Sequence, residues 1–150
     1  LGAPAWLPAP PPPVTPPTPE PPPPAPPVGV ARIRTRYGPV SEPANSAIKA
    51  AWPEDLWVNA AELSYLESSW NPNAENNTVD TIGPCGTRYT LPDGRRATSE
   101  LSQGIFQINV CAHGSGNWKD PLVNARKAYE LYQASGWYPW TYSARALGLI

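Results

Sequence analysis

The sequence contains no methionine, a single histidine and only two cysteines, and this scarcity excludes some kinds of site. A structural zinc site usually takes four Cys or His side chains, more than the chain offers. We therefore expect no metal ion and no cofactor. The chain begins with Leu1 and Gly2, and the lack of methionine favours a processed product or a fragment of a longer polypeptide.

Charge is also sparse, and it is balanced. The chain holds 11 basic and 12 acidic side chains. A nucleic-acid-binding surface needs a basic run with interleaved aromatics to neutralise several phosphates, and no such run is present. The longest apolar runs are a few residues, whereas a membrane-spanning helix needs about 20. The sequence therefore predicts neither a nucleic-acid partner nor a membrane span.

Proline is concentrated near the N-terminus, where 15 of the 23 prolines lie between Pro4 and Pro27. Apart from Glu20 this stretch has no charge, and it has no repeating apolar face, so it cannot bury enough surface to offset its ordering entropy. We expect residues 1–28 to be an extended linker biased to polyproline II, which tethers one compact domain, residues 29–150, to another domain or particle. A PxxP ligand for a partner protein is the alternative.

Helices dominate the expected compact domain. A short helix is predicted over residues 44–52, and a longer one begins at Pro53, because proline is tolerated at the first helical position. Another helix begins after Asp120, a favourable N-cap residue, and ends at Gly136. A last short helix is expected after Trp140.

A small β excursion is expected within residues 75–103, which lack helical periodicity and are rich in Thr, Gly, Asp and Asn. Residues 89–96 predict a β-hairpin, since Pro92, Asp93 and Gly94 are typical of its turn. The predicted fold class is therefore α+β, predominantly helical, with a small hairpin.

One carboxylate lies on the apolar face of the helix that begins at Pro53. This face has members at spacings of four and three residues: Leu56, Ala60, Leu63, Glu67 and Trp70. The neighbouring glutamates fit the usual exposed position: Glu54, Glu62 and Glu75. If the face points to the core, desolvation raises the pKa of Glu67. A carboxyl still protonated near neutral pH can protonate the leaving oxygen of a glycosidic bond. A core carboxylate satisfied by an arginine or tyrosine is the alternative.

Four segments carry a family resemblance. Residues 67–74 read ESSWNPNA, similar to the signature E-S-x-aromatic-N-P-x-A, and residues 102–108 read SQGIFQI, similar to S-x-G-[LI]-M-Q-[IL] with Phe106 in place of Met. Residues 120–132 are similar to D-P-x-x-N-x-x-x-A-x-x-Y, and residues 136–140 read GWYPW. In this order the segments resemble the soluble lytic transglycosylase and goose-type lysozyme group of the lysozyme-like superfamily, including its secreted and phage-associated members.

The resemblance implies roles for individual residues. Glu67 matches the single catalytic acid/base of the family. Ser68 and Ser102 match serines that position this glutamate or the N-acetyl group of the substrate. Gln107 matches a glutamine of the saccharide groove. Tyr142 matches the tyrosine of a Y-N-A-G motif that hydrogen-bonds the acid, although this sequence replaces the Asn and the Gly of that motif.

Aromatic rings supply the expected saccharide affinity, because a formally neutral domain cannot hold an anionic cell wall by charge. The candidates for stacking on sugar faces are Trp118, Trp137, Tyr138 and Trp140, and we place Trp137 among the substrate-binding residues. Most aromatics of such a domain are expected in the core.

The implied reaction cleaves the β-1,4 bond between N-acetylmuramic acid and N-acetylglucosamine in peptidoglycan glycan strands. A lytic transglycosylase needs one carboxyl group, whereas a hydrolytic muramidase of the goose type needs a second carboxylate. The stretch between Glu67 and Gln107 is longer than expected for minimal members of the family. Asp80 is our candidate within it for a second carboxylate. A non-catalytic wall-binding or virion structural module is a further alternative.

The two cysteines, Cys85 and Cys111, predict a disulfide if the protein works outside the cytoplasm, with two buried thiols as the alternative. The bond would pin the β excursion against the cleft. Because its substrate lies in the cell wall, we expect the protein there, either secreted or associated with a phage virion.

Overall fold

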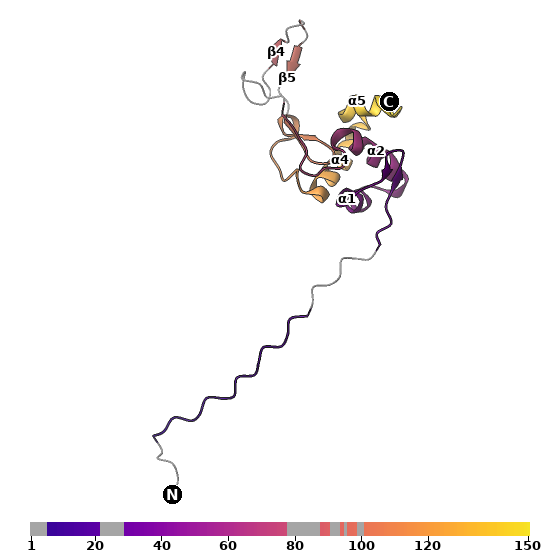
Figure 1. Ribbon diagram of the computed structural model, residues 1–150. Helices are drawn as coiled ribbons and strands as arrows, with labels where there is room; N and C mark the ends of the chain where they lie inside the picture. Colours follow the sequence, from indigo (N-terminus) through magenta and orange to yellow (C-terminus); the bar gives the residue numbers. More distant parts are fainter. Residues whose placement is uncertain (1–5, 22–28, 78–87, 91–93, 95, 99–100) are drawn as a thin grey trace.

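The computed structural model describes the chain in six segments: residues 6–21, 29–77, 88–90, 94, 96–98 and 101–150. Residues 6–21 are extended and exposed, without helix or strand (Figure 1). The boundary predicted at residue 28 lies outside the described residues, so the division into linker and domain stays a prediction. No helix in the described segments is long and apolar enough to cross a membrane.

Helices α1 (Ala44–Ala51) and α4 (Pro121–Ser135) pack against each other. Helix α4 begins as predicted: Pro121 is its first residue, and the backbone N–H of Val123 donates to Asp120 Oδ1 across 3.0 Å. It ends at Gly136, whose φ of 62° suits a residue without a Cβ. These local signals set the ends of α4.

Helix α2 (Trp57–Ser68) follows a single 3-10 turn, η1 (Glu54–Leu56). The α-helix therefore begins four residues after Pro53, where the sequence predicted its start. The helix is enclosed on more than one side, since the five consecutive residues 60–64 are all buried. A single apolar stripe does not describe such a helix.

Glu62 is buried because α2 is enclosed on more than one side, and only 5% of this residue is exposed. Glu62 Oε2 accepts hydrogen bonds from both the backbone N and Nε of Arg36, each across 2.9 Å. The expectation that Glu62 faces water is wrong. This residue is the core carboxylate satisfied by an arginine, the situation considered as an alternative for Glu67.

Two antiparallel arrangements make up the β excursion. The first is a three-stranded sheet in the order β3-β6-β7: Glu75–Asn77, Leu101–Gln103 and Ile108–Asn109. The second is the predicted hairpin, β4 (Arg88–Thr90) with β5 (Arg96–Thr98), and it stands out from the helices in Figure 1. Pro92 and Asp93 lie outside the described residues.

Two short strands, two short helices and a further 3-10 turn complete the domain. They are the β1–β2 hairpin (Arg34–Thr35 and Gly38–Pro39), α3 (Val110–His113), η2 (Tyr138–Trp140) and α5 (Thr141–Ala146). Helix α5 is the predicted short helix after Trp140. The sequence predicted no structure for the segment that forms β1 and β2.

An aromatic cluster forms the centre of the core. Trp52 stacks on Phe106 and on Trp137, with ring centroids 5.4 and 5.6 Å apart. Tyr132 and Trp137 pack at 4.6 Å. Trp140 Nε1 donates to the Phe106 carbonyl across 2.8 Å. The cluster thus joins α1, α4 and the C-terminal segment to the loop that precedes β7.

Asn124 of α4 holds that loop by three hydrogen bonds. Its Oδ1 accepts from Phe106 N across 2.9 Å, and its Nδ2 donates to the carbonyls of Gln103 (2.9 Å) and Trp118 (2.8 Å). The loop approaches so closely that a Cβ on Gly104, whose φ is +81°, would lie 2.1 Å from the Trp118 oxygen. Glycine is therefore required at this position.

Candidate active site

A cavity of about 320 Å³ lies where α2, the β6–β7 sheet and the C-terminal segment meet. Its lining residues are Glu67, Ser102, Gln107, Asn109, Pro139, Trp140, Thr141 and Tyr142. Five of them are residues that the sequence singled out, and they come from three separate regions of the chain. The volume is within the range of small-ligand sites.

Glu67 lies in the last turn of α2 and is half-buried. The helix ends one residue after Glu67, at Ser68, and the next residue, Ser69, has a left-handed φ of 54°. Ser143 Oγ, from α5, donates to Glu67 Oε1 across 2.8 Å. The carboxyl group is therefore positioned at a helix end by contact with an element 76 residues later in the chain.

Ser68 ties this helix end to the neighbouring loop. Its Oγ donates to the carbonyl of Ser64 across 3.0 Å and to the carbonyl of Ile105 across 2.8 Å. Ser68 is next to Glu67 in sequence but is not among the residues that line the cavity. Its contacts hold the backbone that carries Glu67.

Ser102, Gln107 and Asn109 form the polar wall opposite the C-terminal segment. Ser102, in β6, is only 2% exposed. Gln107 has a φ of 50°, and its Nε2 donates to the carbonyls of Ala74 (3.1 Å) and Gly104 (2.9 Å). Asn109 Oδ1 accepts from Cys111 N across 2.9 Å. These bonds fix both amide side chains before any ligand is present.

The C-terminal segment contributes to the site differently from the expectation. Tyr142 lines the cavity and is 91% exposed, and the hydrogen bond to Glu67 assigned to it by resemblance comes from Ser143 instead. Trp137 is 8% exposed, packs against Trp52 in the core and does not line the cavity. Trp140 is the tryptophan of this segment that reaches the cavity wall. Ser143 stands where the Y-N-A-G motif has Asn, and this position was the only sequence signal for it.

Glu75 is turned away from the cavity. In the sheet it lies opposite Gln103, whereas Asn76 lies opposite Ser102. Because successive strand residues point to opposite faces, Glu75 and Gln103 share the face that Ser102 does not. A hydrogen bond from Gln103 Nε2 (3.0 Å) and the charge of Lys119 lower the pKa of Glu75.

Asp80, the candidate for a second carboxylate, lies outside the described residues, as do Asp93 and Glu100. Among the residues that the structure describes, Glu67 is the only carboxylate that lines the cavity. The described segments also contain no group of three or more His, Cys, Asp or Glu side chains that could hold a metal ion.

A protein-family model described as a lysozyme like domain matches residues 44–142. The chain belongs to the lysozyme-like domain family. No curated protein and no solved structure gives a significant match. The matched range begins with α1 and includes every residue that lines the cavity. Membership indicates an α+β lysozyme-like fold and a function on peptidoglycan, with glycosidic bond cleavage as the general activity.

Cys111 follows β7 in this lysozyme-like domain and is disulfide-bonded. Cys85 is the other cysteine of the sequence and lies outside the described residues. The pairing of Cys85 with Cys111 therefore stays a prediction. The backbone N–H of Cys111 donates to Oδ1 of Asn109, which lines the cavity, so Cys111 is held next to the cavity wall.

Proposed function

We propose that this lysozyme-like domain is a peptidoglycan lytic transglycosylase in which Glu67 is the single catalytic acid and base. It would cleave the β-1,4 bond between N-acetylmuramic acid and N-acetylglucosamine. The observation that carries the proposal is that Glu67 is the only carboxylate among the described residues lining the cavity. A transglycosylase needs only one.

The surroundings of Glu67 suit a group that must first give a proton. It lies at the C-terminal end of α2, is half-buried and lines the cavity. A protonated Glu67 can then donate to the glycosidic oxygen.

The reaction proceeds in two proton transfers. Glu67 gives its proton to the glycosidic oxygen as the bond from that oxygen to C1 of the muramoyl residue breaks, and N-acetylglucosamine leaves with a free hydroxyl. The Glu67 carboxylate then takes the proton of the muramoyl C6 hydroxyl, whose oxygen bonds to C1 and closes a 1,6-anhydro ring. Glu67 is protonated again, and no water is consumed.

Substrate binding in this proposal relies on the polar wall and on one exposed ring. Ser102, Gln107 and Asn109 offer fixed hydrogen-bonding groups suited to sugar hydroxyl and N-acetyl groups. Tyr142, 91% exposed at the cavity edge, offers an aromatic face for a sugar ring. Trp137 is left out of the binding residues because its ring is in the core.

A hydrolytic muramidase is the second candidate. Strand β3 ends at Asn77, opposite Leu101 and beside Ser102 of the cavity wall, and the chain continues from there toward Asp80. A carboxylate that entered the cavity from this side would activate water in place of the C6 hydroxyl. The product distinguishes the two reactions.

The cellular setting is part of the same proposal. An enzyme of glycan strands works at the cell wall, so we place it outside the cytoplasm, either secreted or on a virion. The proline-rich segment, residues 1–28, would then act as a tether between the domain and another domain or particle.

The test is mass spectrometry of peptidoglycan digested by the full chain, by Glu67→Gln and by Glu54→Gln, an exposed glutamate as matched control. We expect products lighter by one water than hydrolysed muropeptides from the parent and the control, and none from Glu67→Gln. Reducing muramic acid ends would assign a hydrolase. Wall binding without any released fragment would assign a non-catalytic module, and release by Glu67→Gln at the parent rate would remove Glu67 from the reaction.

A further inference from the structure

The carboxyl group of Glu67 is held by Ser143, a residue to which the family signatures assign no role. Ser143 Oγ donates to Glu67 Oε1 across 2.8 Å, and the two residues lie on different helices, α5 and α2. Both side chains are half-buried. The expected donor was Tyr142, whose side chain is instead almost fully exposed.

Two hydrogen bonds and one buried residue hold the backbone near Ser143. Immediately before α5, Trp140 Nε1 donates to the Phe106 carbonyl across 2.8 Å. Thr141 Oγ1 donates to the Tyr138 carbonyl across 2.7 Å. Ala144, the residue after Ser143, is fully buried in the core. The hydroxyl of Ser143 is therefore presented to α2 from a rigid support.

The backbone of Glu67 is fixed independently, because its neighbour Ser68 bonds to the carbonyls of Ser64 and Ile105. Between the helix and the carboxyl group, a glutamate side chain still has rotational freedom. The hydrogen bond from Ser143 to Oε1 reduces this freedom.

We propose that Ser143 is a positioning residue whose hydroxyl orients the Glu67 carboxyl group in the cavity for proton transfer. The proposal rests on the proposed function in so far as Glu67 is the acid. Ser143 is not among the residues that line the cavity, so it acts through Glu67 and not on the substrate.

The hydroxyl has an electrostatic consequence as well as a geometric one. A donor to a carboxyl oxygen stabilises the ionised form more than the neutral form. Removal of the hydroxyl therefore makes Glu67 harder to ionise. Because cleavage begins from the protonated acid, the alkaline limb of the pH–rate profile should move to higher pH when the hydroxyl is absent.

The kinetic test compares Ser143→Ala, Ser143→Thr and the control Ser135→Ala, an exposed serine at the end of α4. We expect kcat of Ser143→Ala to fall about tenfold with little change in KM. A loss of this size corresponds to the energy of one hydrogen bond to a charged group. Its alkaline limb should move to higher pH. Ser143→Thr keeps a hydroxyl and should restore both. Parent kinetics in Ser143→Ala, or a Thr variant as impaired as the Ala variant, would overturn the proposal.

A second measurement does not depend on catalysis. The carboxyl signals of the full chain are titrated by carbon NMR, and the Glu67 signal is the one missing from Glu67→Gln. We expect a higher titration midpoint in Ser143→Ala and a parent-like one in Ser143→Thr. An unchanged midpoint overturns the role of Ser143 even if the protein cleaves walls. A raised midpoint in a protein that cleaves nothing supports that role and overturns the proposed function alone.

Discussion

Asn124 is the side chain whose loss should most sharply uncouple α4 from the loop that carries Gln107. The residue is fully buried, and it makes three hydrogen bonds to backbone groups of Phe106, Gln103 and Trp118. Replacement by alanine removes all three and leaves the buried N–H of Phe106 without this partner.

The expected cost follows from these contacts. At about 1 kcal/mol per hydrogen bond, three bonds amount to about 3 kcal/mol. The better helix propensity of alanine returns up to about 0.7 kcal/mol, and the unpaired N–H of Phe106 adds about 1 kcal/mol or more. We therefore expect Asn124→Ala to lower the free energy of unfolding by about 3 kcal/mol, which lowers Tm by about 10 °C for a domain of this size.

Urea unfolding followed by tryptophan fluorescence measures this change, since the chain has seven tryptophans. Asn117→Ala, an exposed asparagine before the same helix, is the control and should unfold like the parent. Asn124→Asp keeps an acceptor for Phe106 N but turns an oxygen toward two carbonyls, so it should be at least as unstable as Asn124→Ala. If both Asn124 variants lose less than about 1 kcal/mol, the three-bond account of this residue is refuted.

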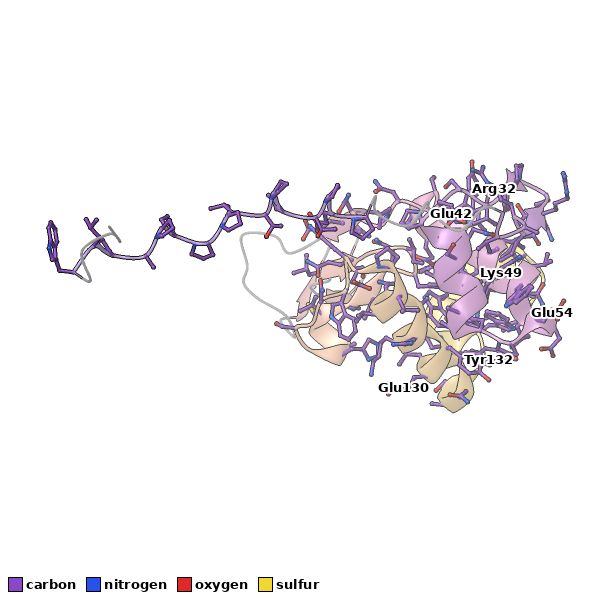
Figure 2. The ribbon with its side chains drawn as sticks, turned by 90° about the horizontal axis from the view of Figure 1, so that it is seen from below. Arg32, Glu42, Lys49, Glu54, Glu130 and Tyr132 are labelled. Atoms are coloured by element: carbon purple, nitrogen blue, oxygen red, sulfur yellow. The ribbon has the colours of Figure 1, made fainter. Side chains whose placement is uncertain are left out.

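Two further predictions concern the surface. Burial disfavours the ionised form of Glu42. Hydrogen bonds from Asn45 Nδ2 (3.0 Å) and Ser46 N (3.1 Å), together with the charge of Arg32, outweigh this effect and lower the pKa of Glu42. Figure 2 shows Arg32 and Glu42 near each other beside α1. Glu42→Gln should therefore be less stable than the parent at neutral pH. This difference should shrink as pH falls through the lowered pKa of Glu42, because protonation removes the contribution; an equal difference in urea unfolding at neutral pH and at about pH 3 would contradict this. Tyr142→Ala should raise KM for glycan fragments about fivefold without a change in Tm, because it loses about 1 kcal/mol of apolar contact. Tyr142→Phe keeps the ring and should keep the parent KM. Equal effects of the two variants on KM would show that the ring does not contribute to binding.

Local features of the sequence predict several elements correctly. The ends of α4 follow from Asp120 and Gly136, because capping involves residues within one helical turn. The strands β4 and β5 follow from a turn-forming segment between two short runs. The identity of Glu67 as a candidate acid came from a motif of eight neighbouring residues. Each of these inferences depends on residues that are close together in the chain.

Burial within α2 could not be predicted in the same way. The apolar stripe selected Glu67 as the enclosed glutamate, whereas Glu62 is the more buried of the two. Periodicity assumes that a helix has one face to the core, but α2 is covered on more than one side. Arg36, which satisfies Glu62, lies 26 positions away, and no local pattern links them.

The sequence by itself determined the helices with clear caps and the hairpin, and it singled out Glu67 as the candidate acid, because propensity, capping, turn chemistry and short motifs act over a few residues. The tertiary structure alone decided what surrounds Glu67. It placed Ser143, 76 positions away, against Glu67, moved Trp137 into the core and turned Glu75 away from the cavity. These outcomes depend on how α2, α5 and the sheet pack together, and packing between distant segments leaves no periodic signal in the chain.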